Sequence, residues 1–172
     1  VGSTIAREAD DVLYTWAGPE IAVATTKAYS TQLALVYLIG LRFAELLGTI
    51  APEEYRAIVH ELQCIPDKLE EILNNRDDIQ YFASIYFNHP SIFFIGRNID
   101  YAVGLEGSLK LKEISYIHSE AYAAGELKHG TISLIEPGTL VVALASCDKL
   151  FEKTMSNVVE VKSRGADVLG LT

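Results

Sequence analysis

Residues 91–96 read SIFFIG, a short continuous apolar run that ends in glycine. Such a run is typical of a strand buried on both faces of a parallel sheet, because it lacks the polar–apolar alternation of half-exposed strands. The pattern continues with a helix at 100–117, a strand at 139–145, a helix at 148–162 and a strand at 166–171. This order predicts an α/β fold, a parallel sheet flanked by helices in three Rossmann-like layers. Residues 118–131 are polar and small, and no strand is predicted there.

The first half of the chain has a helical pattern instead. Three helices are predicted, at 22–48, 52–73 and 77–88. Pro52 suits the first turn of the second of these helices, because its missing N–H has no intrahelical partner there. The helix at 22–48 is apolar on most of its surface, so we expect it to be buried.

Acidic residues are concentrated in one part of the chain. The 172 residues include 14 basic and 23 acidic side chains, which gives a net charge of −9. Residues 51–80 hold eight acids and three bases, and therefore −5 of this total. We interpret 51–90 as an acidic helical linker between the last part of one lobe, 1–50, and the first part of a second, 91–172.

Composition argues against several kinds of function. The excess of acids leaves no uniform basic surface for nucleic acid, and the longest apolar run, Leu33–Leu41, is too short to span a bilayer. Cys64 and Cys147 show no CxxC spacing, and no histidine pair has the spacing of a metal site. We therefore expect no metal or other cofactor, neither nucleic acid nor membrane as partner, and a reducing, cytoplasmic location.

Three charged residues in the second half are candidates for catalysis. Glu106, Lys110 and Glu113 are four and three residues apart, so on a helix they lie along one face. Taken alone, this spacing is more typical of a surface ion pair. However, the helix follows the glycine end of a buried strand, the edge where open α/β sheets bind ligands. A carboxylate beside an ammonium group near that edge could act as a base.

Two further segments are candidates for binding or proton transfer. His129 lies in a polar stretch with a glycine on either side, and is either an exposed loop histidine or an acid/base group. Hydroxyl side chains gather at the start of the helix at 22–48: Thr25, Thr26, Ser30 and Thr31. They could hold a sugar or a phosphate, or could equally serve in capping and packing.

Two long strings make the sequence distinctive: GPEIAVATTKAYSTQ at 18–32 and LEGSLKLKEISYIHSEAYAAGELKHG at 105–130. They closely resemble the sugar-isomerase (SIS) half of the glutamine–fructose-6-phosphate aminotransferase family, also called glucosamine-6-phosphate synthases. The likeness covers essentially the whole chain and implies an SIS-type fold. It also implies the conversion of fructose 6-phosphate and glutamine into glucosamine 6-phosphate and glutamate by a homodimer. The ammonia would come from a glutaminase domain of the parent chain.

The resemblance also implies roles for the charged residues. Glu113 would be the base that moves a proton between C1 and C2 of the sugar, with Lys110 as its cationic partner. Glu106 would be a supporting carboxylate. His129 would open the sugar ring in the site of the neighbouring subunit.

Sugar-binding positions follow from the same resemblance. Val23 and Thr25 match positions whose backbone and hydroxyl hold the sugar. Thr25 stands where serine is common in the family, and Thr131 stands where proline often follows the His-Gly pair. Both departures are mild and do not affect the proposed chemistry.

Two other functions remain open. One is a non-catalytic SIS module that binds phosphosugars, and the other is a related sugar isomerase or deglycase without ammonia chemistry. Glu113 and His129 favour the enzyme over the sensor, because a sensor needs no proton shuttle.

We expect the chain to be a piece of a longer protein, truncated at both ends. It opens with Val1 rather than Met, and the family's phosphate-binding loops and lysine-bearing tail are missing from the sequence. We therefore predict that this polypeptide alone is inactive and binds fructose 6-phosphate weakly at best. The measurement is incubation with fructose 6-phosphate and ammonia, and any formation of glucosamine 6-phosphate would contradict the prediction.

Overall fold

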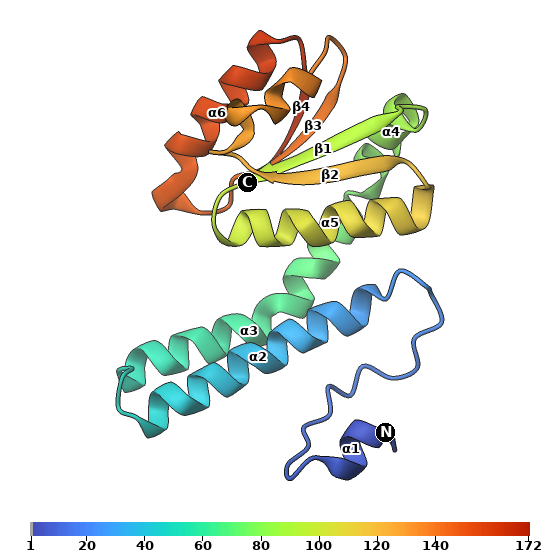
Figure 1. Cartoon of the computed structure of the whole chain (residues 1–172). Helices are drawn as coiled ribbons and strands as arrows, with labels where there is room; N and C mark the ends of the chain where they lie inside the picture. The colour runs from blue at the N-terminus through green and yellow to red at the C-terminus, as the bar shows by residue number, and fades with distance from the viewer. Residues whose placement is uncertain (1) are drawn as a thin grey trace. The chain divides into compact units, whose positions relative to one another are not determined.

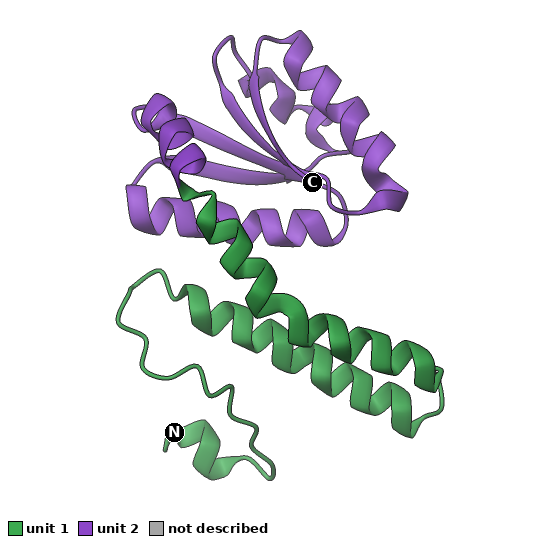
Figure 2. Cartoon of the chain, turned by 180° about the vertical axis from the view of Figure 1, so that it is seen from behind, with its two compact units in different colours: residues 1–76 green, residues 77–172 purple. Residues whose placement is uncertain are grey.

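The computed structural model describes residues 2–172, and the chain divides into two compact units, 1–76 and 77–172 (Figure 2). The boundary between the units falls inside the acidic segment 51–90. Within it, residues 52–74 and 76–86 are helical, and its role as a linker remains a prediction. The division into lobes at 1–50 and 91–172 remains a prediction.

The first unit consists of helices and connecting segments. It contains α1 (Thr4–Glu8), α2 (Thr26–Leu46) and α3 (Pro52–Asn74), and α2 packs against α3 (Figure 1). The predicted ranges of α2 and α3 are confirmed to within a few residues. The predicted burial of α2 is wrong, since Leu41 is its one buried residue. Residues 2–76 contain no sheet that could cover the helix, so side chains such as Val36 and Phe43 stay exposed.

The second unit is an α/β domain. Its helices are α4 (Arg76–Tyr86, which starts at the boundary), α5 (Ile99–Ser115) and α6 (Phe151–Ser163), with short 3₁₀ turns η1 (Leu127–His129), η2 (Thr131–Leu134) and η3 (Asp148–Leu150). Its strands are β1 (Ser91–Gly96), β2 (His118–Ala123), β3 (Leu140–Leu144) and β4 (Asp167–Leu171). All neighbouring strands are parallel, in the order β2-β1-β3-β4. The predicted α/β fold with a parallel sheet is therefore confirmed.

Strand β2 was not predicted, so the sheet has four strands instead of three. It pairs with β1 along its whole length, from Ser91 opposite His118 to Gly96 opposite Ala123. The strand lies at the edge of the sheet and can therefore carry polar side chains. Its buried Ser119 is satisfied, because the hydroxyl donates to the Ser108 carbonyl of α5 at 2.8 Å. The polar composition of residues 118–131 therefore did not exclude a strand there.

The core lies on both faces of the sheet, because successive side chains of a strand point to opposite sides. One cluster contains Phe93, Ile95, Val141 and Ala143 together with Val158 and Val161 of α6. The other contains Ile92, Leu140, Val142 and Leu144, with Phe82 of α4 and Leu111 of α5 packed against them. The sheet is thus the middle of three layers, with α6 on one face and α4 and α5 on the other (Figure 1).

The turn from β1 into α5 requires glycine. A Cβ atom on Gly96 would lie 2.6 Å from the backbone carbon of Asp100 and 2.7 Å from the nitrogen of Tyr101. No side chain can relieve this clash by rotating, because both atoms belong to the backbone. The close approach sets where α5 begins relative to the sheet.

We predict that Gly96→Ala lowers the free energy of unfolding of this chain by about 3 kcal/mol, since the added methyl group forces the helix away from the strand. Urea denaturation followed by circular dichroism measures the loss. The matched control is Gly170→Ala in β4, where an added Cβ meets nothing within 4 Å. The control should change stability by about 0.5 kcal/mol or less, and equal losses in the two variants would contradict the clash.

Candidate functional site

Helix α5 has two different faces. Gly104, Ser108 and Leu111 face the sheet: an added Cβ on Gly104 would lie 3.6 Å from Phe94, Ser108 is buried, and Leu111 packs against the core. Each of these three positions is followed two residues later by a charged residue: Glu106, Lys110 or Glu113. Two residues correspond to a rotation of about 200° around the helix axis. The charged residues therefore lie on the face opposite to the sheet.

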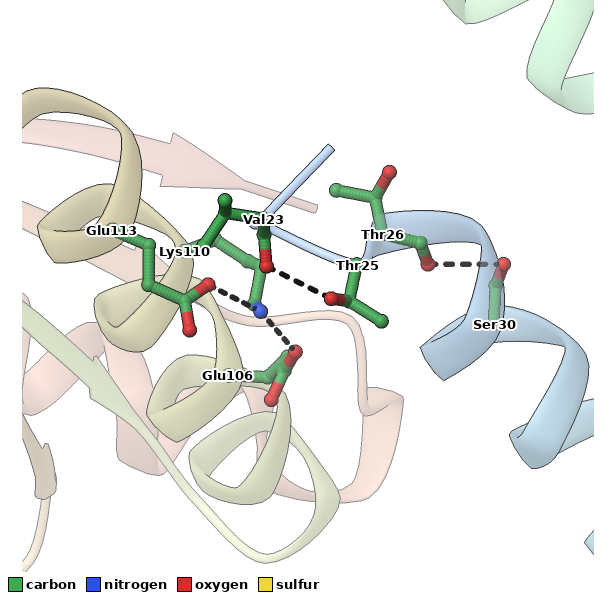
Figure 3. Close-up of polar contacts among 7 residues, drawn as sticks. All are labelled: Val23, Thr25, Thr26, Ser30, Glu106, Lys110 and Glu113. Carbon is green, nitrogen blue, oxygen red and sulfur yellow. Dashed lines mark hydrogen bonds and ion pairs between the residues drawn. The ribbon is translucent and has the colours of Figure 1, made fainter. Parts of the chain in front are cut away.

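The three charged side chains are in direct contact, as their spacing predicted. Lys110 Nζ lies 2.6 Å from Glu113 Oε2 and 3.4 Å from Glu106 Oε1 (Figure 3). The hydrogen bond with Glu113, followed by the bond with Glu106, raises the pKa of Lys110 above its ordinary value. The lysine therefore stays protonated at neutral pH. We call this set the α5 triad, two carboxylates held by one fixed cation.

The α5 triad lies away from the carboxyl edge of the sheet. Because β1 and β2 are parallel, α5 runs back from that edge toward the start of β2. Glu106 and Glu113 come seven and fourteen residues after the first residue of α5, Ile99. They are therefore about 10 and 21 Å along the helix axis. The expectation that the triad lies near the strand ends is wrong, although the contact within the triad is confirmed.

His129 is not brought to the α5 triad. It ends the 3₁₀ turn η1, its side chain is exposed, and its backbone N–H donates to the Glu126 carbonyl at 3.0 Å. Within residues 2–172 its imidazole makes no hydrogen bond or ion pair.

Thr25 forms a strained turn at the start of α2. Its backbone is left-handed, with φ 54° and ψ 38°, a conformation that β-branched residues rarely adopt and that costs about 1–3 kcal/mol. The hydroxyl does not cap the helix, and donates instead to the Val23 carbonyl at 2.8 Å (Figure 3). Val23 itself is 86% exposed. Strain and exposure of this kind are typical of a binding turn.

Two other hydroxyls of this segment, those of Ser30 and Thr31, have local partners. Ser30 donates to the Lys27 carbonyl at 3.1 Å, and Thr31 donates to the same carbonyl at 2.9 Å. For these two residues the structure supports the packing role rather than the binding role. The Thr25 hydroxyl differs from these two, because it donates to the carbonyl of the exposed Val23 at the turn itself.

Two polar connections were missed at the sequence level. Asp100 accepts hydrogen bonds from the backbone N–H and the hydroxyl of Ser146, and Arg97 donates two hydrogen bonds to the side-chain oxygen of Asn157. The position of these residues in the sequence could have revealed the two connections. Arg97 directly follows β1, and Ser146 comes two residues after the end of the adjacent strand β3. These contacts tie the helices to the carboxyl edge of the sheet.

The described part of the chain contains neither a cluster of metal-ligating side chains nor a membrane-spanning helix. Between residues 2 and 172, no three His, Cys, Asp or Glu side chains lie close enough together to hold a metal ion. Over the same range, every helix is either too short or too polar to cross a bilayer.

The four-stranded parallel sheet flanked by helices is the fold of an SIS-type α/β domain. The model of the SIS domain family matches residues 85–172, which is more than half of the sequence. The chain belongs to the SIS domain family.

Similar proteins narrow this class. The chain is 61% identical, over 98% of its length, to glutamine–fructose-6-phosphate aminotransferase (isomerizing) of Caldanaerobacter subterraneus subsp. tengcongensis, and 57% identical over 99% to that of Clostridium acetobutylicum. It spans 28% of the length of each relative. Among solved structures, 98% of it matches the C-terminal domain of glucosamine-fructose-6-phosphate aminotransferase from Francisella tularensis, with a TM-score of 0.95 and 37% identity over 48% of that chain. The resemblance stated from the sequence is confirmed.

We predict a pH signature of the α5 triad in stability. The pKa of Lys110 is raised from 10.5, so its stabilising contribution is complete below that pH and is lost as the pH rises through the raised value. The difference in melting temperature between wild type and Lys110→Met should be constant at neutral pH and shrink above about pH 10.5. The exposed Lys153 on α6 provides the control variant Lys153→Met. A gap that shrinks in the same way for both variants would contradict the prediction.

Proposed function

We propose that the chain is part of the isomerase half of an enzyme that makes glucosamine 6-phosphate from fructose 6-phosphate and glutamine. The observation that carries this proposal is the α5 triad, which lies inside the part of the chain that matches the SIS domain family. The names of the two relatives described above support the same reaction.

The α5 triad suits the proton transfer of an aldose–ketose isomerisation. The reaction needs a base that moves a proton between C1 and C2 through a planar intermediate. Glu113 would be this base, because its carboxylate is the one in closest contact with Lys110. The protonated Lys110 would stabilise the negative charge that develops on the sugar oxygen. Glu106, 3.4 Å from the ammonium group on the other side, would be a positioning residue.

The Thr25 turn suits the binding of a sugar. The Thr25 hydroxyl uses its single proton in the bond to the Val23 carbonyl, so its free lone pairs can accept from a sugar hydroxyl. The Val23 carbonyl has a second lone pair for the same purpose. We propose that Val23 and Thr25 together hold hydroxyl groups of the open sugar.

His129 would act on a neighbouring subunit. Because its imidazole is exposed, it is available to open the sugar ring in the site of a second copy. The proposed partners of the chain are therefore a homodimer mate and a glutaminase domain that supplies ammonia. We place the enzyme in the cytoplasm.

The test is Glu113→Gln in the full-length parent enzyme. Loss of the base should lower formation of glucosamine 6-phosphate by about 10²-fold or more, while hydrolysis of glutamine continues. The matched control is Glu53→Gln, because Glu53 also contacts a cation three residues away, Arg56 at 2.9 Å, on an exposed helix surface. The control should retain full activity.

This assay and two further observations on the parent protein separate the alternative functions. Full synthase activity in Glu113→Gln would remove this residue from the proposed mechanism. A parent enzyme that binds phosphosugars without converting them would indicate a sensor. A parent reading frame without a glutaminase domain would indicate a sugar isomerase or deglycase that uses no ammonia.

A further inference from the structure

An arginine directly after β1 lies against the segment that carries His129. A Cβ atom on Gly125 would lie 3.2 Å from both Nη1 and Nη2 of Arg97, so the missing side chain at Gly125 lets the two groups meet. The backbone joins the same two segments, because the Ala124 N–H donates to the Gly96 carbonyl at 2.8 Å. The guanidinium group and the start of the turn after β2 are therefore in direct contact.

The guanidinium group of Arg97 is also held by α6. Its Nε and Nη2 groups donate to one acceptor, the side-chain oxygen of Asn157, at 3.2 and 2.8 Å. Asn157 is only 3% exposed, and its amide nitrogen donates to a Glu160 oxygen at 3.1 Å. A planar guanidinium group with two donors on one buried acceptor has a defined orientation. Arg97 therefore forms a rigid connection between α6 and Gly125.

The His129 turn, residues 125–129, has a second anchor in the core. Leu127 is fully buried, and it belongs to the same core cluster as Val158 and Val161 of α6. The His129 side chain, in contrast, is exposed and has no hydrogen bond or ion pair within residues 2–172. The backbone of the turn therefore determines where the imidazole lies.

We infer that Arg97 is a positioning residue for His129. Leu127 alone fixes the turn at one point, about which it could still rotate, and the contact of Arg97 with Gly125 supplies a second point. Position matters because a proton-transfer group must come within about 2.6–3.2 Å of the atom it serves. A misplacement of about 1 Å can lower a rate by about 10²-fold. The inference rests on the proposed role of His129 in opening the sugar ring.

The test is Arg97→Lys in the full-length parent enzyme, assayed with two sugars. Lysine keeps the charge but cannot place two fixed donors on Asn157. One sugar is fructose 6-phosphate, which closes into a ring through its C5 hydroxyl. The other is 5-deoxyfructose 6-phosphate, which lacks that hydroxyl and stays open. The kcat should fall about tenfold with the first sugar and less than about twofold with the second. A merely structural role would lower both equally.

Two further variants support this assay. The matched control is Arg164→Lys, because Arg164 is an exposed arginine directly after α6, and it should leave both activities unchanged. Gly125→Ala replaces Arg97→Lys if the latter fails to fold. Its backbone needs no left-handed conformation, and the added methyl group presses on the guanidinium group alone. It should lower kcat selectively with the cyclic sugar.

The variant His129→Ala separates this inference from the proposed function. It should show the same selective loss, and adding Arg97→Lys should cause no further loss, since both changes act on one step. If His129→Ala shows no selective loss, the ring-opening role is wrong and the inference falls with it. If His129→Ala shows the selective loss and Arg97→Lys affects both sugars equally, or neither, the inference alone is overturned.

Discussion

The close packing of α5 against the sheet is the interaction on which the rest of the second unit depends. Gly96 lets the chain turn directly from β1 into the helix, and Gly104 and Ser108 let the helix axis approach the strands. The hydroxyl of Ser119 then fastens the edge strand β2 to α5. Because the small residues take the face toward the sheet, the charged residues are turned to the opposite face. Packing and the proposed chemistry thus use two sides of one helix.

Much of the architecture could be predicted, because apolar runs are strong signals for buried strands. β1 and β3 lie between two helical layers and read as continuous apolar segments, so they were found almost to the residue. β2 was missed because an edge strand with a satisfied buried serine needs no such run. The burial of α2 was wrongly predicted, since composition does not tell which other surfaces are present to cover a helix.

In the candidate site too, contacts between residues close in the sequence could be predicted, whereas contacts that depend on the tertiary fold could not. Helical spacing was enough to predict the contact of Lys110 with its two glutamates, because residues three and four apart are neighbours on any helix. The left-handed backbone of Thr25 could not be predicted, since threonine disfavours it. The pairing of Asp100 with Ser146 joins residues far apart in the chain, and only the strand order brings them together.

The central claim is that the α5 triad is the site of proton transfer. A crystal structure of the whole enzyme with a six-carbon polyol 6-phosphate, a reduced analogue of the open sugar, tests this claim most directly. The account predicts that a Glu113 carboxylate oxygen lies within about 3.5 Å of C1 and C2, with Lys110 next to the oxygen on C2. An analogue bound with C1 and C2 more than about 6 Å from Glu113, against another acid or base, would contradict it.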